Sequence, residues 1–300
     1  MNDDILQAKI ESQSWKISEA FLNGILMEVS AYPKPGLVSS VSMGSHKDMN
    51  ILTFMASSAA IYPCFTLCAQ AGRDHEGELR DLLKSIREIG IIYEKRLLTA
   101  TKGINTQRGI LFANGVLSGA AGFLSKESSR IDSFRLFDTA ASITRGICKR
   151  ELGNLPLDKK VLTAGEHLYK RYKATGIRGE VENGFPSVRA KGLPAFREAL
   201  GKGTSLNLSL VHVLISLMSV VEDTTILWRK DEGCLKKVHL AAQNVIDKGS
   251  VFTSEGLRNI EALNEEFIKE NISPGGSADL VAVTASSYLL ENGQYPVSIM

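Results

Sequence analysis

Apolar residues recur every three or four positions along most of this chain, a spacing that places them on one face of an α-helix. Residues 77–98 show this most clearly, with leucine or isoleucine at 79, 82, 83, 86, 89 and 92 and charged residues between them. No segment alternates apolar and polar residues over the length of a strand. The pattern therefore predicts helices over residues 4–30, 48–71, 77–98, 132–150, 157–173, 187–200, 204–222, 232–247 and 254–271. One further helix is predicted to start at residue 110, and a final one to end near residue 291.

About ten helices without a clear sheet predict an all-α fold. The chain contains no internal repeat, low-complexity segment or long linker. We therefore expect residues 1–300 to form a single multi-helix, bundle-like domain, with the polar loops between its helices clustered at one end.

Composition narrows the possible functions only a little. The 300 residues are 44% hydrophobic and 23% charged, and a net charge of +2 gives no sign of a nucleic-acid-binding protein or a polybasic membrane tail. The acidic N-terminus does not resemble a signal peptide, and the longest apolar run, residues 208–221, is too short to span a bilayer. Four scattered cysteines fit reduced thiols. We expect a soluble, cytoplasmic protein without nucleic-acid or membrane partners.

One segment, EVSAYPKPGLVSSVSMGSHKDM at residues 28–49, is too rich in Pro, Gly and Ser for regular structure. Its two prolines fix backbone angles and favour a stiff, extended arm that carries Lys34. Gly44 and Ser45 are predicted to cap the next helix and to place His46 and Asp48 in its first turn. Titratable groups on a stiff loop between helices are typical of catalytic sites, although a capped helix connector has the same composition.

Four further loops combine glycine with a carboxylate, an amide or a cation. Together the five segments are 34–48, 105–109, 178–182, 223–229 and 273–279. If they converge, they bring together the carboxylates of Glu28, Asp48, Glu180, Asp223 and Asp279 and the cations of Lys34, Arg108, Arg178 and Arg229. Carboxylates hold Mg²⁺ beside phosphate oxygens, and Arg and Lys contact the remaining phosphate charge, so the set suits a phosphorylated substrate with a metal.

Each loop also has a simpler structural interpretation. Ser277 and Asp279 are favourable residues at a helix start without any ligand, and Asn105 could cap the helix that follows it. Asp223 could pair locally with Arg229, and Arg178 could lie in a solvated turn. These alternatives stay open until the tertiary arrangement is known.

Five motifs in order resemble the triphosphoribosyl-dephospho-CoA synthase family. They are EVSAYPKPGLVSS with GSHKDM, GINTQRGILF, TAGEHLYKRYKATGIRGEVENGFP, LMSVVEDTTILWR and NISPGGSADLVAVT, which extend from about residue 28 to residue 285. The resemblance implies a helical pentosyltransferase, that is, a glycosyltransferase for which ATP is a substrate. This enzyme would join C1 of the ATP ribose to a ribose hydroxyl of 3'-dephospho-CoA and release adenine. The product is the prosthetic-group precursor for the acyl carrier subunit of citrate lyase or malonate decarboxylase, so that subunit and a carrier-protein transferase are further expected partners.

Cleavage of an N-glycosidic bond develops positive charge at C1, which a carboxylate stabilises, and the departing base and attacking hydroxyl need an acid and a base. The expected catalytic residues are Glu28, His46, Asp48 and Glu180. The expected Mg²⁺ ligands are Asp48, Asp223 and Asp279. The residues expected to bind ATP and its phosphates are Lys34, Asn105, Arg108, Arg178, Arg229, Gly275, Gly276 and Ser277.

The sequence departs from the family pattern in two places. The family usually has DTN and a short glycine turn where this chain has Asp223-Thr224-Thr225 followed by Trp228, and it tends to have His-Lys where this chain has Gln107-Arg108. Both changes remove groups that could contact a metal or a base. These two departures bear on the identity of the substrate more than on the class of reaction.

Two other functions are consistent with the same residues. A Mg²⁺-dependent helical hydrolase would cleave a nucleotide or ADP-ribosyl N-glycosidic bond with water as the acceptor. A non-catalytic helical module that binds a carrier or enzyme subunit would need neither the repeated Lys, Asp and Gly nor loops that converge, and it would expose a large apolar face.

Overall fold

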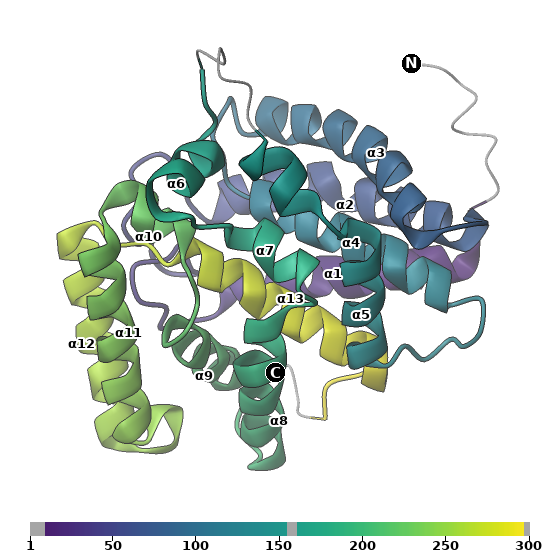
Figure 1. The fold of residues 1–300 in the computed structure, drawn as a ribbon. Helices are drawn as coiled ribbons and strands as arrows, with labels where there is room; N and C mark the ends of the chain where they lie inside the picture. Colours follow the sequence, from purple (N-terminus) through teal and green to yellow (C-terminus); the bar gives the residue numbers. More distant parts are fainter. Residues whose placement is uncertain (1–9, 155–160, 297–300) are drawn as a thin grey trace.

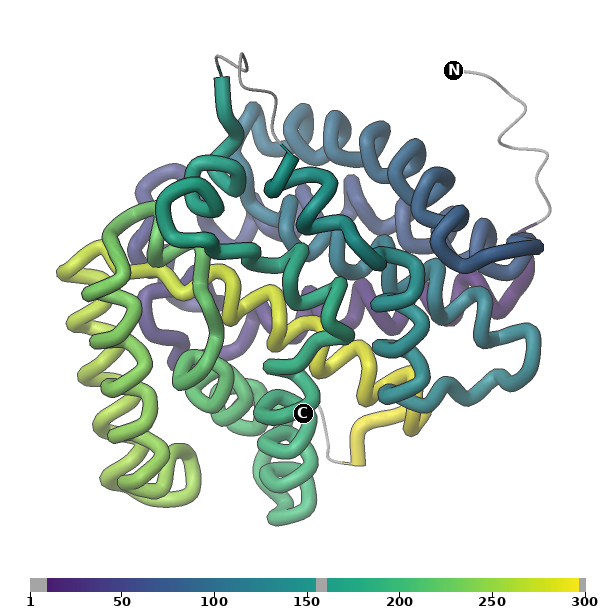
Figure 2. Tube along the Cα trace, viewed as in Figure 1, coloured from purple at the N-terminus to yellow at the C-terminus, as the bar shows by residue number. Residues whose placement is uncertain are grey.

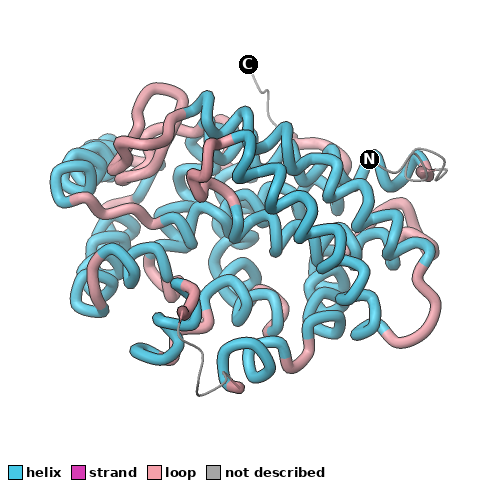
Figure 3. Tube along the Cα trace, turned by 90° about the horizontal axis from the view of Figure 1, so that it is seen from above, coloured by secondary structure: helices cyan, strands magenta, loops and turns pink. Residues whose placement is uncertain are grey.

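The computed structural model describes residues 10–154 and 161–296 and contains only helices and loops in those ranges (Figures 1 and 3). This confirms the prediction of an all-α fold. The α-helices are α1 Ser12–Ser30, α2 Ile51–Asp74, α3 Leu79–Ala100, α4 Arg108–Leu124, α5 Ser133–Thr144, α6 Ala164–Tyr172, α7 Gly176–Glu182, α8 Leu193–Gly201, α9 Leu206–Met218, α10 Thr224–Arg229, α11 Glu232–Asp247, α12 Ser254–Glu270 and α13 Gly275–Asn292. Short π-helical turns cover Lys149–Gly153 and Val188–Gly192, and a 3₁₀ turn covers Ser250–Phe252.

The described ranges contain thirteen α-helices, two more than the eleven segments that the pattern predicts, because two polar segments expected as loops form short helices. These are α7, in the segment around Arg178, and α10, which follows Asp223. The predicted helix 132–150 ends early, at the turn formed by Gly146 with φ +79°. Residues 4–9 and 157–160 of two other predicted helices lie outside the described residues.

The segment after α1 differs from its prediction at both ends. It is not an extended arm, because Lys34 and Pro35 begin a turn, completed by Gly36 at φ +68°. The next helix does not begin at Ser45, whose hydroxyl donates instead to the carbonyls of residues 267 and 272. It begins at Ile51, because the Asn50 side chain accepts a hydrogen bond from the N–H of Thr53 and caps α2. His46 and Asp48 therefore lie in a loop.

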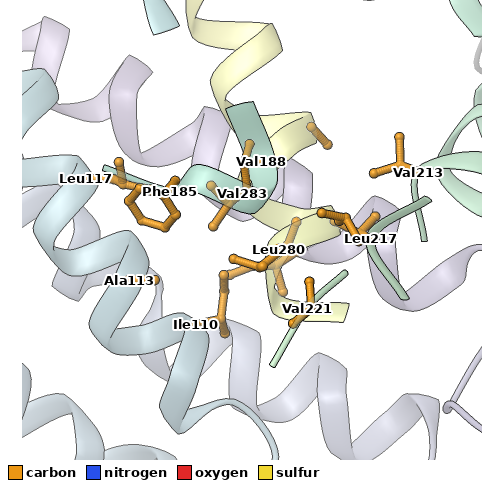
Figure 4. Packing of buried hydrophobic residues seen from close by; sticks show 14 of the residues in the cluster. Ile110, Ala113, Leu117, Phe185, Val188, Val213, Leu217, Val221, Leu280 and Val283 are labelled. Carbon is orange, nitrogen blue, oxygen red and sulfur yellow. The ribbon is translucent and has the colours of Figure 1, made fainter. Parts of the chain in front are cut away.

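Helix α13 runs through the middle of the molecule and packs against α1, α4, α5, α8, α9 and α10 (Figures 1 and 2). Figure 4 shows Leu280 and Val283 of α13 among apolar side chains from α4, α9 and the segment after α7. Some helices pack closely because a glycine, which has no side chain, lies at their contact. A Cβ on Gly122 of α4 would lie 1.9 Å from the carbonyl oxygen of Ala69 in α2. The packed core fixes where the first turn of α13 stands.

Helix α2 is the one helix in the described ranges that is long and apolar enough to cross a bilayer. It packs against α1, α3 and α4, so it forms part of the core between other helices. Such a test is also passed by core helices of globular proteins, and it gives no independent reason to place this chain in a membrane.

Candidate active site

The five polar segments line one cavity of about 770 Å³, as their predicted convergence requires. The expected site residues that line it are Glu28, Lys34, His46, Asp48, Asn105, Arg108, Glu180, Arg229, Gly275, Gly276 and Asp279. The three that do not line it are Arg178, Asp223 and Ser277. Convergence is what a catalytic or binding site needs, and it is the arrangement that a non-catalytic module was expected to lack.

Glu28 and Lys34 form a buried ion pair at the wall of the cavity. The Lys34 Nζ donates to the Glu28 carboxylate and, at 2.8 Å, to the Glu28 backbone carbonyl. Burial raises the pKa of Glu28 and lowers that of Lys34, and the attraction between the two charges opposes both shifts. Each group thus already has a partner, and the turn through Pro35 holds them together.

The His46 ring is held by hydrogen bonds on both of its nitrogens. Arg229 donates to Nδ1 over 3.0 Å, and Nε2 lies 3.0 Å from the Ser273 hydroxyl oxygen. Because a guanidinium can only donate, Nδ1 must accept and the ring proton lies on Nε2. Burial, together with the charge of Arg229, lowers the pKa of His46 to about 4, while Asp48 acts in the opposite direction. The ring is neutral near pH 7 and links the loop to the start of α13.

The Arg229 guanidinium donates several hydrogen bonds to other protein atoms. Besides His46, it donates to the Ser45 carbonyl at 3.0 Å and to the Asn271 side chain at 3.3 Å. It still lines the cavity, where its positive charge is available to an anion. The geometry gives Arg229 two effects, holding the loop at residues 45–46 and placing a cation at the site.

Asp223 is a buried cap shared by two helices. Its Oδ1 accepts from the N–H groups of Thr225 and Ile226 at the start of α10. Its Oδ2 accepts from the N–H and hydroxyl of Ser277 in the first turn of α13, at 2.8 and 3.0 Å. Burial raises the pKa of Asp223, and these hydrogen bonds, with one from the Gly276 N–H, oppose the rise. The carboxylate that was expected to bind metal is thereby occupied.

The same contacts change the expected role of the α13 terminus. The N–H groups of Gly276 and Ser277 were expected to bind phosphate, but they already donate to the Asp223 carboxylate. Gly276 itself packs closely, since a Cβ there would lie 3.2 Å from that carboxylate. The positive end of α13 therefore holds a protein anion, and the residues form a rigid support for the adjacent turn.

Asp279 lies two residues after Ser277 on α13 and lines the cavity. In the described part of the chain its carboxylate forms no hydrogen bond or ion pair, in contrast to Asp223. Burial raises its pKa well above the usual range, and the nearby charges of Glu28 and Asp223 raise it further. Its Oδ2 rests against Gly109 of α4, where a Cβ would lie only 2.1 Å away. A glycine at 109 is thus required for this carboxylate to occupy its place.

Glu180 and Glu222 face the cavity from α7 and from the segment before α10. Ser187 donates to Glu180 through its hydroxyl at 2.5 Å and its N–H at 3.3 Å. Burial nevertheless raises the pKa of Glu180, and the charge of Glu222 adds to the effect. Glu222 accepts from the N–H groups of Thr175 and Gly176, at 2.8 and 3.2 Å. A carboxyl group with a raised pKa beside a cavity is suited to proton transfer near neutral pH.

The remaining expected phosphate ligands lie in different surroundings. Arg108 is exposed at the start of α4, pairs with Glu94 and lines the cavity beside Asn105. Arg178 instead pairs with Glu151 at 2.9 Å and is not among the cavity-lining residues. The periodicity of α7 explains this difference, because Arg178 and Glu180 are two positions apart and point to different sides of a helix.

Sequence reasoning missed several residues that complete the site. Gln107 was noted only as a departure, yet it is buried, accepts a hydrogen bond from the Ser57 hydroxyl and donates one to the Ser58 hydroxyl, which fixes the start of α4. Ser273 holds His46, and Glu222 anchors the start of α7. Their position inside the polar segments was the available signal, but their partners come from distant parts of the chain.

The candidate metal ligands do not form a cluster. Among the described residues, no group of three or more His, Cys, Asp or Glu side chains is arranged to hold a metal ion. Mg²⁺ in nucleotide sites commonly needs only one or two carboxylates, with phosphate oxygens and water as the other ligands. Asp279 offers free carboxylate oxygens in the cavity and Asp48 a largely exposed carboxylate at its edge, so this donor set fits an ion that arrives with phosphates.

Comparison with known proteins places the chain among enzymes of one kind. The family model described as ATP:dephospho-CoA triphosphoribosyl transferase (CitG) matches residues 14–297. A probable 2-(5''-triphosphoribosyl)-3'-dephosphocoenzyme-A synthase from Malonomonas rubra is 47% identical over 97% of this chain and 92% of the relative. The synthase from Klebsiella pneumoniae is 36% identical over 90% of this chain and 89% of the relative.

The synthase from Pectobacterium atrosepticum is 38% identical over 89% of this chain and 87% of the relative. No solved structure matches the chain significantly. The residues that the family model matches include the five polar segments and the cavity that they line. The chain therefore belongs to the ATP:dephospho-CoA triphosphoribosyl transferase family.

Proposed function

We propose that this protein transfers the 5-triphosphoribosyl group of ATP to 3'-dephospho-CoA with release of adenine. Membership of the family supports this activity. The observation that carries it in the structure is the Asp279 carboxylate, which has no partner among the described residues and lies in a cavity lined by all five polar segments. Such a group can act on a substrate without first breaking a contact within the protein.

The reaction breaks the bond between C1 of the ATP ribose and adenine, and forms a bond from C1 to a ribose hydroxyl oxygen of the acceptor. Adenine takes up one proton and the hydroxyl loses one, so the exchange is balanced. Glu180, whose pKa is raised, would donate the proton to adenine. Asp279 would stabilise the positive charge at C1 and help to accept the hydroxyl proton.

The triphosphate stays on the transferred group and provides binding energy that positions C1. Arg108, Arg229 and Asn105 line the cavity and would contact its oxygens. Asp279 and Asp48 would hold Mg²⁺, which supplies positive charge to the phosphates when it is bound.

The groups that already have protein partners would also act by position. Asp223 and Ser277 fix the first turn of α13 and therefore Asp279, whereas His46 and Arg229 hold the loop that closes one side of the cavity. Glu28 and Lys34 place a compact ion pair beside the same cavity. Arg178, through Glu151, would hold α7 and Glu180.

The product would serve as the prosthetic-group precursor for the acyl carrier subunit of citrate lyase or malonate decarboxylase. A carrier-protein transferase would then be the next enzyme to act on it. Nucleotide substrates and reduced thiols are consistent with a cytoplasmic location.

The test is release of adenine from ATP in the presence of Mg²⁺, with and without 3'-dephospho-CoA, followed by the mass of the CoA product. We expect adenine only when the acceptor is present, together with a mass gain equal to a triphosphoribosyl group. Adenine released without the acceptor would identify an N-glycosidic hydrolase, and no adenine in either sample would overturn the proposal.

A further inference from the structure

A second cavity, of about 430 Å³, adjoins the main one across α6 and α10. The two share Leu168 and Trp228 as lining residues, so both cavities border the same two side chains. Two consecutive residues at the end of α10 face different cavities. Arg229 contacts His46 beside the main cavity, while Lys230 lines only the second cavity. We call this second cavity the α6–α10 groove.

The α6–α10 groove is positively charged. Lys170 and Arg171 line it from the last turn of α6, and Lys230 lines it from the end of α10. None of these three cations forms an ion pair with a described residue, and no Asp or Glu is among the described residues that line the groove. Three cations without an anionic partner among the described residues, placed around one small groove, favour an anionic ligand with more than one charge.

The groove also offers aromatic surface. The Trp228 side chain is 57% exposed, and its ring lies 6.2 Å from the His167 ring, centroid to centroid. Tyr172 also lines the groove, and its buried hydroxyl has no hydrogen-bond partner among the described residues. An exposed tryptophan beside cations is the combination that stacks a nucleobase and neutralises its phosphates.

The main cavity is too small to hold both substrates entirely, so the reaction requires a second subsite. Cavities of roughly 300–1,000 Å³ usually hold one ligand of drug size. ATP and 3'-dephospho-CoA are each at least that large, and both must be present when C1 meets the acceptor hydroxyl. The main cavity of about 770 Å³ suits the donor and the acceptor ribose, which leaves the rest of the acceptor to an adjoining space.

We propose that the α6–α10 groove binds the nucleotide half of 3'-dephospho-CoA, with adenine against Trp228 and the diphosphate near Lys170, Arg171 and Lys230. Because Leu168 and Trp228 border both cavities, a ligand bound in this way has its acceptor ribose next to the main cavity. This inference rests on the proposed transferase activity and adds the place of the acceptor.

Steady-state kinetics test the proposal with each substrate varied in turn. Trp228→Ala and a Lys170→Ala/Lys230→Ala double variant are expected to raise the KM for 3'-dephospho-CoA roughly tenfold or more while changing the KM for ATP less than about twofold. Trp228→Phe keeps an aromatic face and should restore much of the affinity. Arg80→Ala is the control, because it removes one exposed cation from α3, which lines neither cavity.

Fluorescence gives a direct measure of binding, because the chain has only two tryptophans, Trp15 and Trp228. In a Trp15→Phe background, 3'-dephospho-CoA should quench the fluorescence of Trp228, with or without inorganic triphosphate, and the double lysine variant should bind it more weakly.

Groove variants that release adenine with an unchanged KM for the acceptor would overturn this inference and leave the transferase proposal intact. A rise in the KM for ATP alone would also overturn it, by assigning the groove to the donor. An enzyme that releases no adenine at all, yet binds the acceptor at Trp228, would overturn only the transferase proposal.

Discussion

Asp223 and Asp279 occupy neighbouring positions in space but have opposite surroundings. Asp223 is buried and accepts hydrogen bonds from the starts of two helices, so both carboxylate oxygens are used. Asp279, one turn along α13, lines the cavity and has no partner among the described residues. The sequence assigned the same metal-binding role to both. Their contacts indicate instead that Asp223 supports the site and Asp279 acts in it.

The same division separates the other polar groups of the cavity. Glu28 is paired with Lys34, and both ring nitrogens of His46 have partners in Arg229 and Ser273, so these groups are held by the protein as Asp223 is. Removal of such a group should therefore lower stability first, because its former partners stay buried and unpaired. Removal of the open carboxylate should lower activity first, because its contacts form only with substrate.

The strongest test of this comparison is Asp279→Asn. We expect turnover to fall at least about 10³-fold, because a neutral amide can neither balance charge at C1 nor accept a proton. Stability should stay equal or rise: the raised pKa of Asp279 means that the folded state favours its protonated form, so the native carboxylate costs stability as pH rises through its folded pKa. Adenine release and urea unfolding at pH 7 measure both effects. A variant with full turnover would remove Asp279 from the site.

Lys34→Met tests the buried ion pair. It leaves the Glu28 carboxylate buried without its cation, which should lower the free energy of unfolding by roughly 3–5 kcal/mol. Glu28→Gln/Lys34→Met should recover much of that loss, because it leaves no charge uncompensated. The control is Lys202→Met, which breaks a half-exposed pair with Glu198 and should cost less than about 1 kcal/mol. Equal losses in both single variants would contradict the distinction between buried and exposed pairs.

Asp223→Asn tests the shared helix cap. The amide NH₂ would face the N–H and hydroxyl of Ser277, so the variant should lose about 2–3 kcal/mol of unfolding free energy. Turnover should fall as well, through displacement of α13. Asp231→Asn is the matched control, since exposed Asp231 accepts from a single N–H at the start of α11 and Asn caps helices equally well. Chemical denaturation compares the two, and a stable Asp223→Asn enzyme that no longer responds to Mg²⁺ would instead make Asp223 a metal ligand.

The smallest expected effect concerns pH and His46. Because its pKa falls to about 4 on folding, the neutral ring contributes stability that is complete above the unfolded pKa near 6.5 and is lost as pH falls toward 4. The loss should amount to about 2 kcal/mol across that window. Urea unfolding of the native protein and His46→Gln at pH 7, 5.5 and 4.5 measures the difference between them. Parallel pH profiles would show that the ring is not held in its neutral form.

Much of the fold could be predicted from the sequence because the relevant pattern is local. Apolar residues at helical spacing predicted the all-α fold, and residues 232–247 were predicted with the same bounds as α11. Glycine and polar residues correctly marked the segments that line the cavity. The short helices α7 and α10 were missed, since seven and six residues are too few to establish a periodicity.

The sequence by itself determined the helical class, the five polar segments and the resemblance to a transferase family. Only the tertiary structure decided which side chains are already occupied. Asp223 meets Ser277 across 54 residues of chain, and His46 meets Ser273 across 227. Helical spacing repeats within a few residues, so it can be recognised in the sequence. Hydrogen-bond partners and burial depend on how distant segments pack, and they separate the carboxylate that supports the site from the one that is free to act.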